Sequence, residues 1–198
     1  MVTGDGGETT GVILAVVVVL SAIGLGWLLG GRLGQLAGLT LRWTRLVPVA
    51  LLAQLVGGLI SGPAYAVSLA GSVALLSAFL LRNRTVPGTS LIALGLLSNA
   101  LVVGLNGAMP VAGIAAGRAG VTTQHLLTGV DRRHELADEH TRLELLSDVI
   151  PVPWPRLPEV VSPGDVLIAA GLGELVLLAM TGLGASPGRV RRDHAEPS

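Results

Sequence analysis

The residues from Gly11 to Gly31 form a run of 21 that contains no charged side chain. An α-helix needs about 20 mostly apolar residues to cross the hydrocarbon layer of a bilayer. This run therefore predicts a transmembrane helix. The ten residues before it contain Asp5 and Glu8 and no basic residue, which is unlike the positively charged start of a cleaved signal peptide.

The composition extends this prediction to the whole chain. Hydrophobic residues make up 51% of the sequence and charged residues 13%, and the mean hydropathy is +0.70. Four further apolar segments follow the first, at 46–60, 64–81, 87–105 and 166–183. The expected fold is an all-α membrane helix bundle of about five transmembrane helices, forming one domain over residues 1–198. A loop over 106–164 would cap the bundle on its outer face, and a tail would cover 186–198.

The short segments between these spans predict the orientation, because arginines resist translocation. Eight arginines fall in three segments that the alternation of five spans puts on one side: Arg32, Arg42, Arg45, Arg82, Arg84, Arg189, Arg191 and Arg192. The N-terminal tail and the uncharged turn SGPA at 61–64 fall on the other side. We therefore expect a multi-pass protein of the inner (plasma) membrane, with its N-terminus outside and its C-terminus in the cytoplasm.

Small residues predict how the helices pack and which partners the chain has. Glycines recur every four residues at Gly26, Gly30, Gly34 and Gly38, which allows close helix packing within the bundle or, through Gly26 and Gly30, in a homo-oligomer. The segment 32–45 is expected to be an interfacial helix. Membrane lipid is the expected partner. Nucleic acid is not, because no basic cluster is interleaved with aromatic residues. The chain has no cysteine, and neither a metal nor a cofactor is expected.

The stretch LNGAMPVAG, from Leu105 to Gly113, follows the fourth span. Asn106 and Gly107 supply the turn or left-handed backbone that stops a helix. The apolar residues Met109, Pro110 and Val111 come directly afterwards. They indicate that the chain folds back against the bundle and lines a pocket at the outer face, since irregular backbone at this depth needs protein or water to satisfy it.

A proline-rich stretch leads into the last span. Its prolines, at 151, 153, 155 and 158, predict an extended strap, with Trp154 as an interfacial anchor. After it, Ser162 and Asp165 have the spacing of a helix capping box, with Pro163 as the first helical residue. Ligand binding or chemistry at Asp165 is the alternative. If the strap folds back, Asn106 or its neighbouring backbone should lie within hydrogen-bonding reach of Asp165.

For other polar residues, a structural role and an activity are both considered. Asn99 and Glu174 lie inside predicted spans. Asn99 is expected to make an interhelical hydrogen bond, and Glu174 to be protonated or to face a neighbouring helix or subunit. A small-solute or ion-coupled carrier that uses both is the alternative. Asp148 and Asp165 could act together as the paired carboxylates of a membrane hydrolase. The stretch HELADEH, with His134 and His140, is expected to be a solvated charged helix, because its spacing differs from that of zinc-binding HExxH.

The stretches NGAMPV, TRLELLSDVIPVPWP and VSPGDVLIAAG together resemble a family of small polytopic bacterial membrane proteins known only as a domain of unknown function. Its members share Asn-Gly-Gly-x-Met-Pro-Val, Leu-x-Asp-Ile-Ile-Pro and Ser-Ile-Gly-Asp; here Ala108 replaces a glycine and Pro163 an isoleucine. The resemblance implies no activity, which leaves a non-enzymatic membrane or accessory component as the expected function. It does imply a shared outer site, ligand-binding or structural, made of Asn99, Asn106, Gly107, Met109, Pro110, Asp148, Pro151, Ser162, Gly164 and Asp165.

Overall fold

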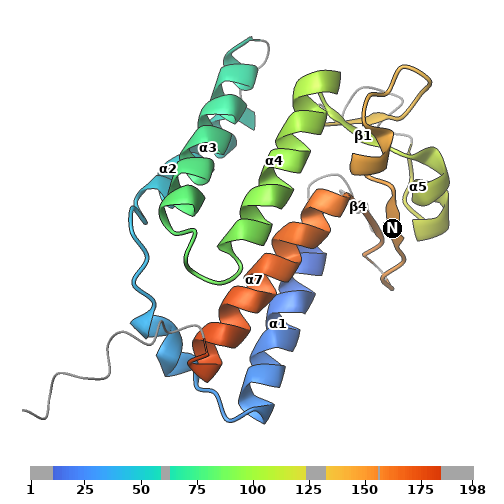
Figure 1. Ribbon diagram of the computed structural model, residues 1–198. Coiled ribbons are helices and arrows are strands. Elements are labelled where there is room, and N and C mark those ends of the chain that lie inside the picture. The colour runs from blue at the N-terminus through green and yellow to red at the C-terminus, as the bar shows by residue number, and fades with distance from the viewer. Residues whose placement is uncertain (1–10, 59–62, 124–132, 156, 184–198) are drawn as a thin grey trace, which may run out of the picture.

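The computed structural model describes residues 11–58, 63–123, 133–155 and 157–183. Five longer helices dominate it: α1 (Val12–Leu28), α2 (Leu46–Gly58), α3 (Pro63–Arg82), α4 (Thr89–Asn106) and α7 (Pro163–Thr181). The N-terminal tail before Gly11, the first half of the predicted turn at 61–64 and the predicted tail at 186–198 lie outside the described residues. The chain is mostly helical, as its composition predicts (Figure 1).

Two of the described helices, α4 and α7, are long and apolar enough to cross a membrane, judged by length and composition. The helix α1 and the apolar parts of α2 and α3 are shorter. Each of the five helices nevertheless coincides with one of the apolar segments found in the sequence.

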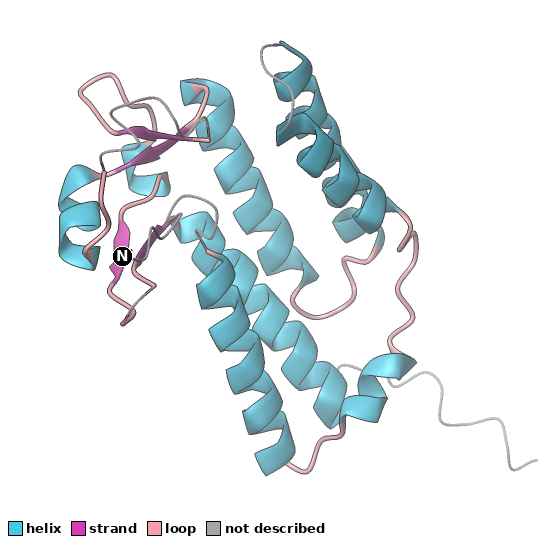
Figure 2. Ribbon diagram, turned by 180° about the vertical axis from the view of Figure 1, so that it is seen from behind, coloured by secondary structure: helices cyan, strands magenta, loops and turns pink. Residues whose placement is uncertain are grey.

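The helix α7 lies at the centre of the packing, although it is the last helix in the chain. It packs along α1 on one side and along α4 on another, and η1 (Leu33–Gly38), a short 3-10 helix, contacts it as well. The helices α2 and α3 form a hairpin that joins the rest through α3 and α4. Both ribbon views show this hairpin as a separate pair beside α4 (Figures 1 and 2).

Two pairs of glycines bring α4 and α7 together. A Cβ added at Gly95 would lie 2.3 Å from the carbonyl oxygen of Gly164, and one added at Gly88 would lie 2.0 Å from that of Gly171. Both distances are far inside van der Waals contact, so the two backbones touch where only glycine fits. The pairing runs antiparallel, since residues later in α4 meet residues earlier in α7.

The expected glycine ridge forms a close contact at one position, on α1. Gly26 is buried against the side chain of Met180 on α7, which is internal packing. Gly30 has a positive φ of 80° just after α1 ends, and no atom would lie within 4 Å of its Cβ. Gly34 and Gly38 lie in η1 with the same open space around them. The helix ends at Leu28, so the four glycines do not share one helical face.

The segment 32–45 is not the continuous interfacial helix that its composition predicts. Only Leu33–Gly38 is helical, and Trp43 has a positive φ of 60°. Hydrogen bonds to the buried Asn83 side chain hold the segment instead. This side chain accepts from the Arg42 N–H and donates to the Arg42 carbonyl oxygen, both at 2.8 Å. The Arg82 guanidinium also lies 5.9 Å from the Trp43 ring centre. Tertiary contacts thus hold this segment in an irregular conformation.

The described residues between α4 and α7 form a small unit that we call the cap. It contains β1 (Met109–Val111), α5 (Gly113–Ala119), β2 (His134–Leu136), η2 (Glu144–Leu146), β3 (Ile150–Val152) and β4 (Glu159–Val161). The strands form two small sheets, in which β1 pairs in parallel with β2 and β3 pairs antiparallel with β4. Its apolar core consists of Val111, Ala115, Ala116, Ala119 and Val160.

The cap corrects one prediction and adds detail to another. The stretch that starts at His134 is a strand paired with β1, and His140 follows in a turn, so the predicted charged helix is wrong over its described part. The proline-rich stretch is extended as predicted, but Pro151 lies inside a strand and pairs with Val160. A strand in a two-stranded sheet has one free edge, which accommodates a proline that lacks an N–H donor.

Candidate functional site

The helix α7 begins with a complete capping box. The Ser162 hydroxyl oxygen accepts from the Asp165 N–H at 2.9 Å, and the Asp165 carboxylate accepts from the Ser162 N–H at 3.0 Å. These bonds satisfy backbone donors that have no partner within the helix. Pro163 occupies the first turn. The capping interpretation of this stretch is therefore confirmed.

Asn99, from the middle of α4, joins this capping box. Its side-chain amide donates to Asp165 Oδ1 at 2.8 Å, and its carbonyl oxygen accepts from the Ser162 hydroxyl at 2.9 Å. Gly164 makes the approach possible, because a Cβ there would lie 1.9 Å from Asn99 Oδ1. The expected interhelical hydrogen bond of Asn99 thus exists, and it links α4 to the first turn of α7.

A second carboxylate, Glu159 on β4, caps the neighbouring helix α1. It is 3% exposed and accepts from the Gly11 N–H at 3.2 Å and from the Leu14 N–H at 3.1 Å. A negative charge at this end also interacts favourably with the helix dipole. Burial raises the pKa of Glu159, and the nearby Asp165 carboxylate raises it further. The two N–H donors lower the pKa, but burial is the largest effect and the pKa is raised overall. Sequence reasoning missed Glu159, since its partners lie 145 and 148 residues away.

Asp148 lies in the same region but has a different environment. It is 1% exposed, and neither carboxylate oxygen accepts a hydrogen bond from the residues that the structure describes. His134 Nε2 is 3.9 Å from its Oδ2, close enough for an ion pair if the imidazole is protonated. Burial first, and then the charges of Asp165 and Glu159, raise the pKa of Asp148 to about 8. The carboxyl group is therefore half protonated near that pH.

Asn106 is placed away from Asp165 and holds another part of the cap. Its side chain accepts from the Arg142 N–H at 2.8 Å and donates to the carbonyl oxygens of Arg142 and Val102, each at 2.9 Å. Gly107 follows with a φ of 93° and ends α4, as the Asn-Gly dipeptide predicts. The proposed contact between Asn106 and Asp165 is replaced by the one that Asn99 makes, because Asn106 lies about two turns farther along α4.

The other residues of the expected outer site lie in the cap strands. Met109 and Pro110 are buried in β1, and the Pro110 carbonyl oxygen accepts from the Asp148 N–H at 3.0 Å. The apolar stretch thus does fold back, as expected, and it holds Asp148 through the backbone. Glu174 lies nine residues after Asp165 on α7, about 13 Å along the helix. This separation keeps Glu174 apart from Asn99, its partner in the carrier alternative.

The chemistry open to this site follows from how its carboxylates are used. Glu159 and Asp165 accept backbone N–H groups at the starts of two helices, and Asp148 is enclosed. Within the described part of the chain, no group of three or more His, Asp or Glu side chains is arranged to hold a metal ion. The arrangement is a joint between the cap and the helix starts, and Asp165 alone of the three also lines a groove on the helices.

These features define a mostly helical protein with two helices of transmembrane length and a small cap fastened to their ends. The sequence matches the model of a family of unknown function, DUF5317, over residues 38–177, and the chain belongs to this family. The expected membership in a family without an assigned function is thereby confirmed.

One curated relative is an uncharacterized protein of Thermotoga maritima. It is 35% identical over 104 residues, which cover 51% of this chain and 57% of the relative. The match therefore spans little more than half the length of that protein. No solved structure matches the chain.

Proposed function

We propose that the protein is a non-enzymatic component of the inner membrane, with five transmembrane helices and an extracytoplasmic cap that covers one end of the bundle. In this proposal α1, α2, α3, α4 and α7 are the spans, the N-terminus is outside and the C-terminus is cytoplasmic. The cap fixes the outer ends of α1, α4 and α7 relative to one another, and that clamping is its role.

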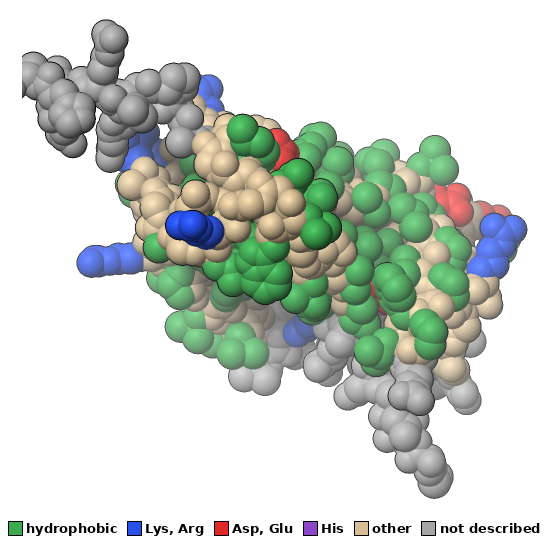
Figure 3. Space-filling model, turned by 90° about the horizontal axis from the view of Figure 1, so that it is seen from below, with side chains coloured by type: hydrophobic (Ala, Val, Ile, Leu, Met, Phe, Trp, Pro, Cys, Tyr) green, Lys and Arg blue, Asp and Glu red, His purple; other side chains and the backbone are tan. Residues whose placement is uncertain are grey.

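The outward faces of the helices support membrane insertion. Large apolar side chains are strongly exposed along them, including Leu20 at 61%, Leu55 at 64% and Leu97 at 52%. Exposure of this kind is unfavourable in water but favourable in lipid. The space-filling view shows wide hydrophobic areas with few charged side chains among them (Figure 3).

The use of the carboxylates supports a structural role for the cap, and this observation carries the proposal. A hydrolase that used Asp148 and Asp165 as paired carboxylates would need both of them to reach one water molecule. Asp165 is engaged by Asn99 and Ser162, and Asp148 is 1% exposed. The hydrogen bonds of Asp165 favour a role in holding the cap to the helices over a role in activating water.

Cysteine accessibility tests the proposal, and the absence of native cysteine gives each single-cysteine variant one thiol. Leu145 on η2 is 83% exposed, and Gln35 on η1 and Arg84 in the α3–α4 turn are also exposed. In intact bacteria, an impermeant maleimide should label Leu145→Cys and a cysteine at Ser61. It should label Gln35→Cys and Arg84→Cys only after the membrane is permeabilised.

Each departure from this pattern identifies a different error. Recovery of the protein in the soluble fraction would exclude the membrane location. A reversed pattern would exclude the orientation, and protection of Ser61→Cys alone would exclude the α2–α3 hairpin as two spans. For the clamping role, Asn99→Ala should loosen the cap without removing the protein from the membrane.

A further inference from the structure

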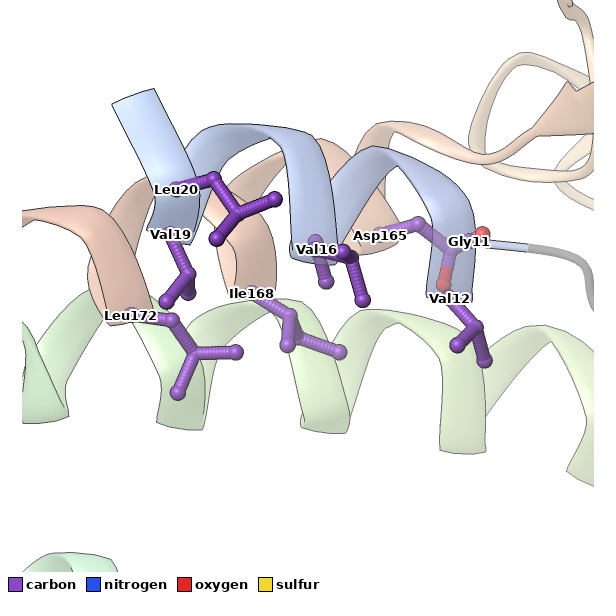
Figure 4. Close-up of a pocket in the computed structure, with 9 residues that line it drawn as sticks. Gly11, Val12, Val16, Val19, Leu20, Asp165, Ile168 and Leu172 are labelled. Carbon is purple, nitrogen blue, oxygen red and sulfur yellow. The ribbon is translucent and has the colours of Figure 1, made fainter. Parts of the chain in front are cut away.

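A groove on the outer half of the helices suggests a ligand, and the inference rests on the membrane location proposed above. Six apolar side chains and Ala15 form its walls, and Gly11 and Asp165 lie at one end. Four of the six come from α1 and two from α7: Val12, Val16, Val19, Leu20, Ile168 and Leu172. Figure 4 shows these side chains around one space, with Asp165 beside Gly11 at the start of α1.

The groove has the dimensions and the openness of a site for one lipid chain. From Gly11 to Leu20 it follows α1 for about 14 Å, roughly half of the ~30 Å hydrocarbon thickness and hence one leaflet. Val12, Val16 and Leu20, spaced four apart on one face of α1, are 54%, 50% and 61% exposed. A groove of one-leaflet length fits an acyl chain better than a partner helix, which would continue through both leaflets.

The charged end of the groove selects the headgroup. Asp165 is the one ionisable side chain among the described lining residues, and Glu159 lies close enough to interact with it electrostatically. The N–H groups of Gly11, Leu14 and Ser162 already donate to Glu159 or Asp165. An anionic headgroup would therefore be repelled by the negative charge at this end of the groove. The N–H groups at the helix starts could not bind it, because they already donate to Glu159 or Asp165.

An ammonium group finds suitable acceptors at the same place. Asp165 Oδ1 accepts from Asn99 and Oδ2 from Ser162, and each carboxylate oxygen has room for a second donor. Gly11 packs against the carboxylate, since a Cβ there would lie 2.9 Å from Asp165 Cγ. Among the described residues, the groove provides an open approach to Asp165.

We propose that this groove binds the acyl chain of a phospholipid that carries a primary amine, with the ammonium group donating to Asp165. Phosphatidylethanolamine is the probe with this chemistry. Phosphatidylglycerol has the same phosphate but no amine, and phosphatidylcholine has a cationic nitrogen without an N–H donor. A preference for phosphatidylethanolamine alone would indicate hydrogen bonding by the amine. Equal binding of phosphatidylcholine would indicate attraction to a cationic nitrogen, and equal binding of all three would indicate general lipid contact.

The test uses the full chain in nanodiscs with each lipid present as a minor component in turn, and native mass spectrometry counts the retained lipids. We expect phosphatidylethanolamine to be retained about tenfold more than either other lipid, as one charge-assisted hydrogen bond provides. Asp165→Asn should remove this preference, because the side chain keeps its shape but loses its charge. Equal retention of the three lipids by the unmodified protein would overturn the proposal without any variant.

A substitution in the wall of the groove locates the binding. Val16→Phe should fill the groove and reduce retention, whereas Leu97→Phe, at a similarly exposed position on α4 outside the groove, should leave it unchanged. Equal effects of both variants would overturn the assignment to this groove. If only the lipid proposal is wrong, the lipid preference will be absent but the cysteine-labelling pattern will still be found. If the membrane location is wrong, the cysteine-labelling test will fail first. The two experiments therefore distinguish the lipid proposal from the proposed function.

Discussion

Asn99 and Asp165 lie 66 residues apart in the sequence and are joined by a 2.8 Å hydrogen bond between the side-chain amide and the carboxylate. The bond connects the middle of α4 with the first turn of α7. Since Asp165 also accepts from the Ser162 N–H, one carboxylate both starts a helix and holds a neighbouring helix. This relationship leads to the first prediction.

Asn99→Ala and Asp165→Ala should each lower the free energy of unfolding, and their effects should be coupled. A double-mutant cycle should give a coupling energy of about 1 kcal/mol or more, because each variant removes the same charge-assisted bond. The free energies can be measured by unfolding in mixed detergent micelles. Additive effects would show that the bond contributes nothing to the stability of the joint.

Gly95→Ala should separate α4 from α7, because its methyl group would lie 2.3 Å from the Gly164 carbonyl oxygen. We expect a loss of about 2 kcal/mol or more in unfolding free energy from this overpacking. Gly104→Ala on the same helix is the matched control, since nothing lies within 4 Å of that position. The control should be neutral or slightly stabilising, as alanine favours helix over glycine. Similar losses in both variants would refute close packing at Gly95.

The stability of the folded chain should fall as the pH rises from about 4 to about 8. In this range the folded protein keeps the Asp148 proton, whose pKa is raised from 3.8 to about 8, while the unfolded chain releases it. The stabilisation is complete below pH 3.8 and is lost as the pH passes through 8. Asp148→Asn should flatten the dependence of the unfolding midpoint on pH, with a residual slope from Glu159. An unchanged slope would mean that Asp148 titrates normally.

Asn106→Ala should release the part of the cap around Arg142. The Asn106 side-chain oxygen Oδ1 accepts from the Arg142 N–H at 2.8 Å, so loss of this bond should accelerate hydrogen exchange at that amide by about tenfold. The amide of Ala137, which donates to the Val111 carbonyl oxygen, serves as the control and should exchange as before. Unchanged exchange at Arg142 would show that the side chain does not hold this segment.

Local signals explain which elements the sequence predicts well. The uncharged runs predict the five longer helices to within a few residues, because the length of an apolar run and the charges around it are properties of neighbouring residues. The capping box at Ser162 and the helix stop at Gly107 also depend on only a few adjacent positions. Each of these features can therefore be recognised from neighbouring residues alone.

Long-range contacts explain the errors and the omissions. His134–Leu136 is a strand because it pairs with Met109–Val111, which lies 25 residues earlier and outweighs the helical pattern of the charged residues. Glu159 shows no local sign that it caps α1. The paired glycines could have been found, since Gly88 and Gly95 are seven apart and so are Gly164 and Gly171. That spacing puts two small residues on one side of each helix.

The central place of α7 sets the order in which the molecule can be completed during synthesis. Both α1 and α4 pack along α7, yet α7 is the last of the described helices to leave the ribosome. Until residues 163–181 are made, the glycine faces of α4 and the start of α1 lack the surface that they contact in the finished bundle. Helix α7 therefore completes the packing of the bundle, and a chain truncated before Pro163 would leave α1 and α4 without the surface that they pack against.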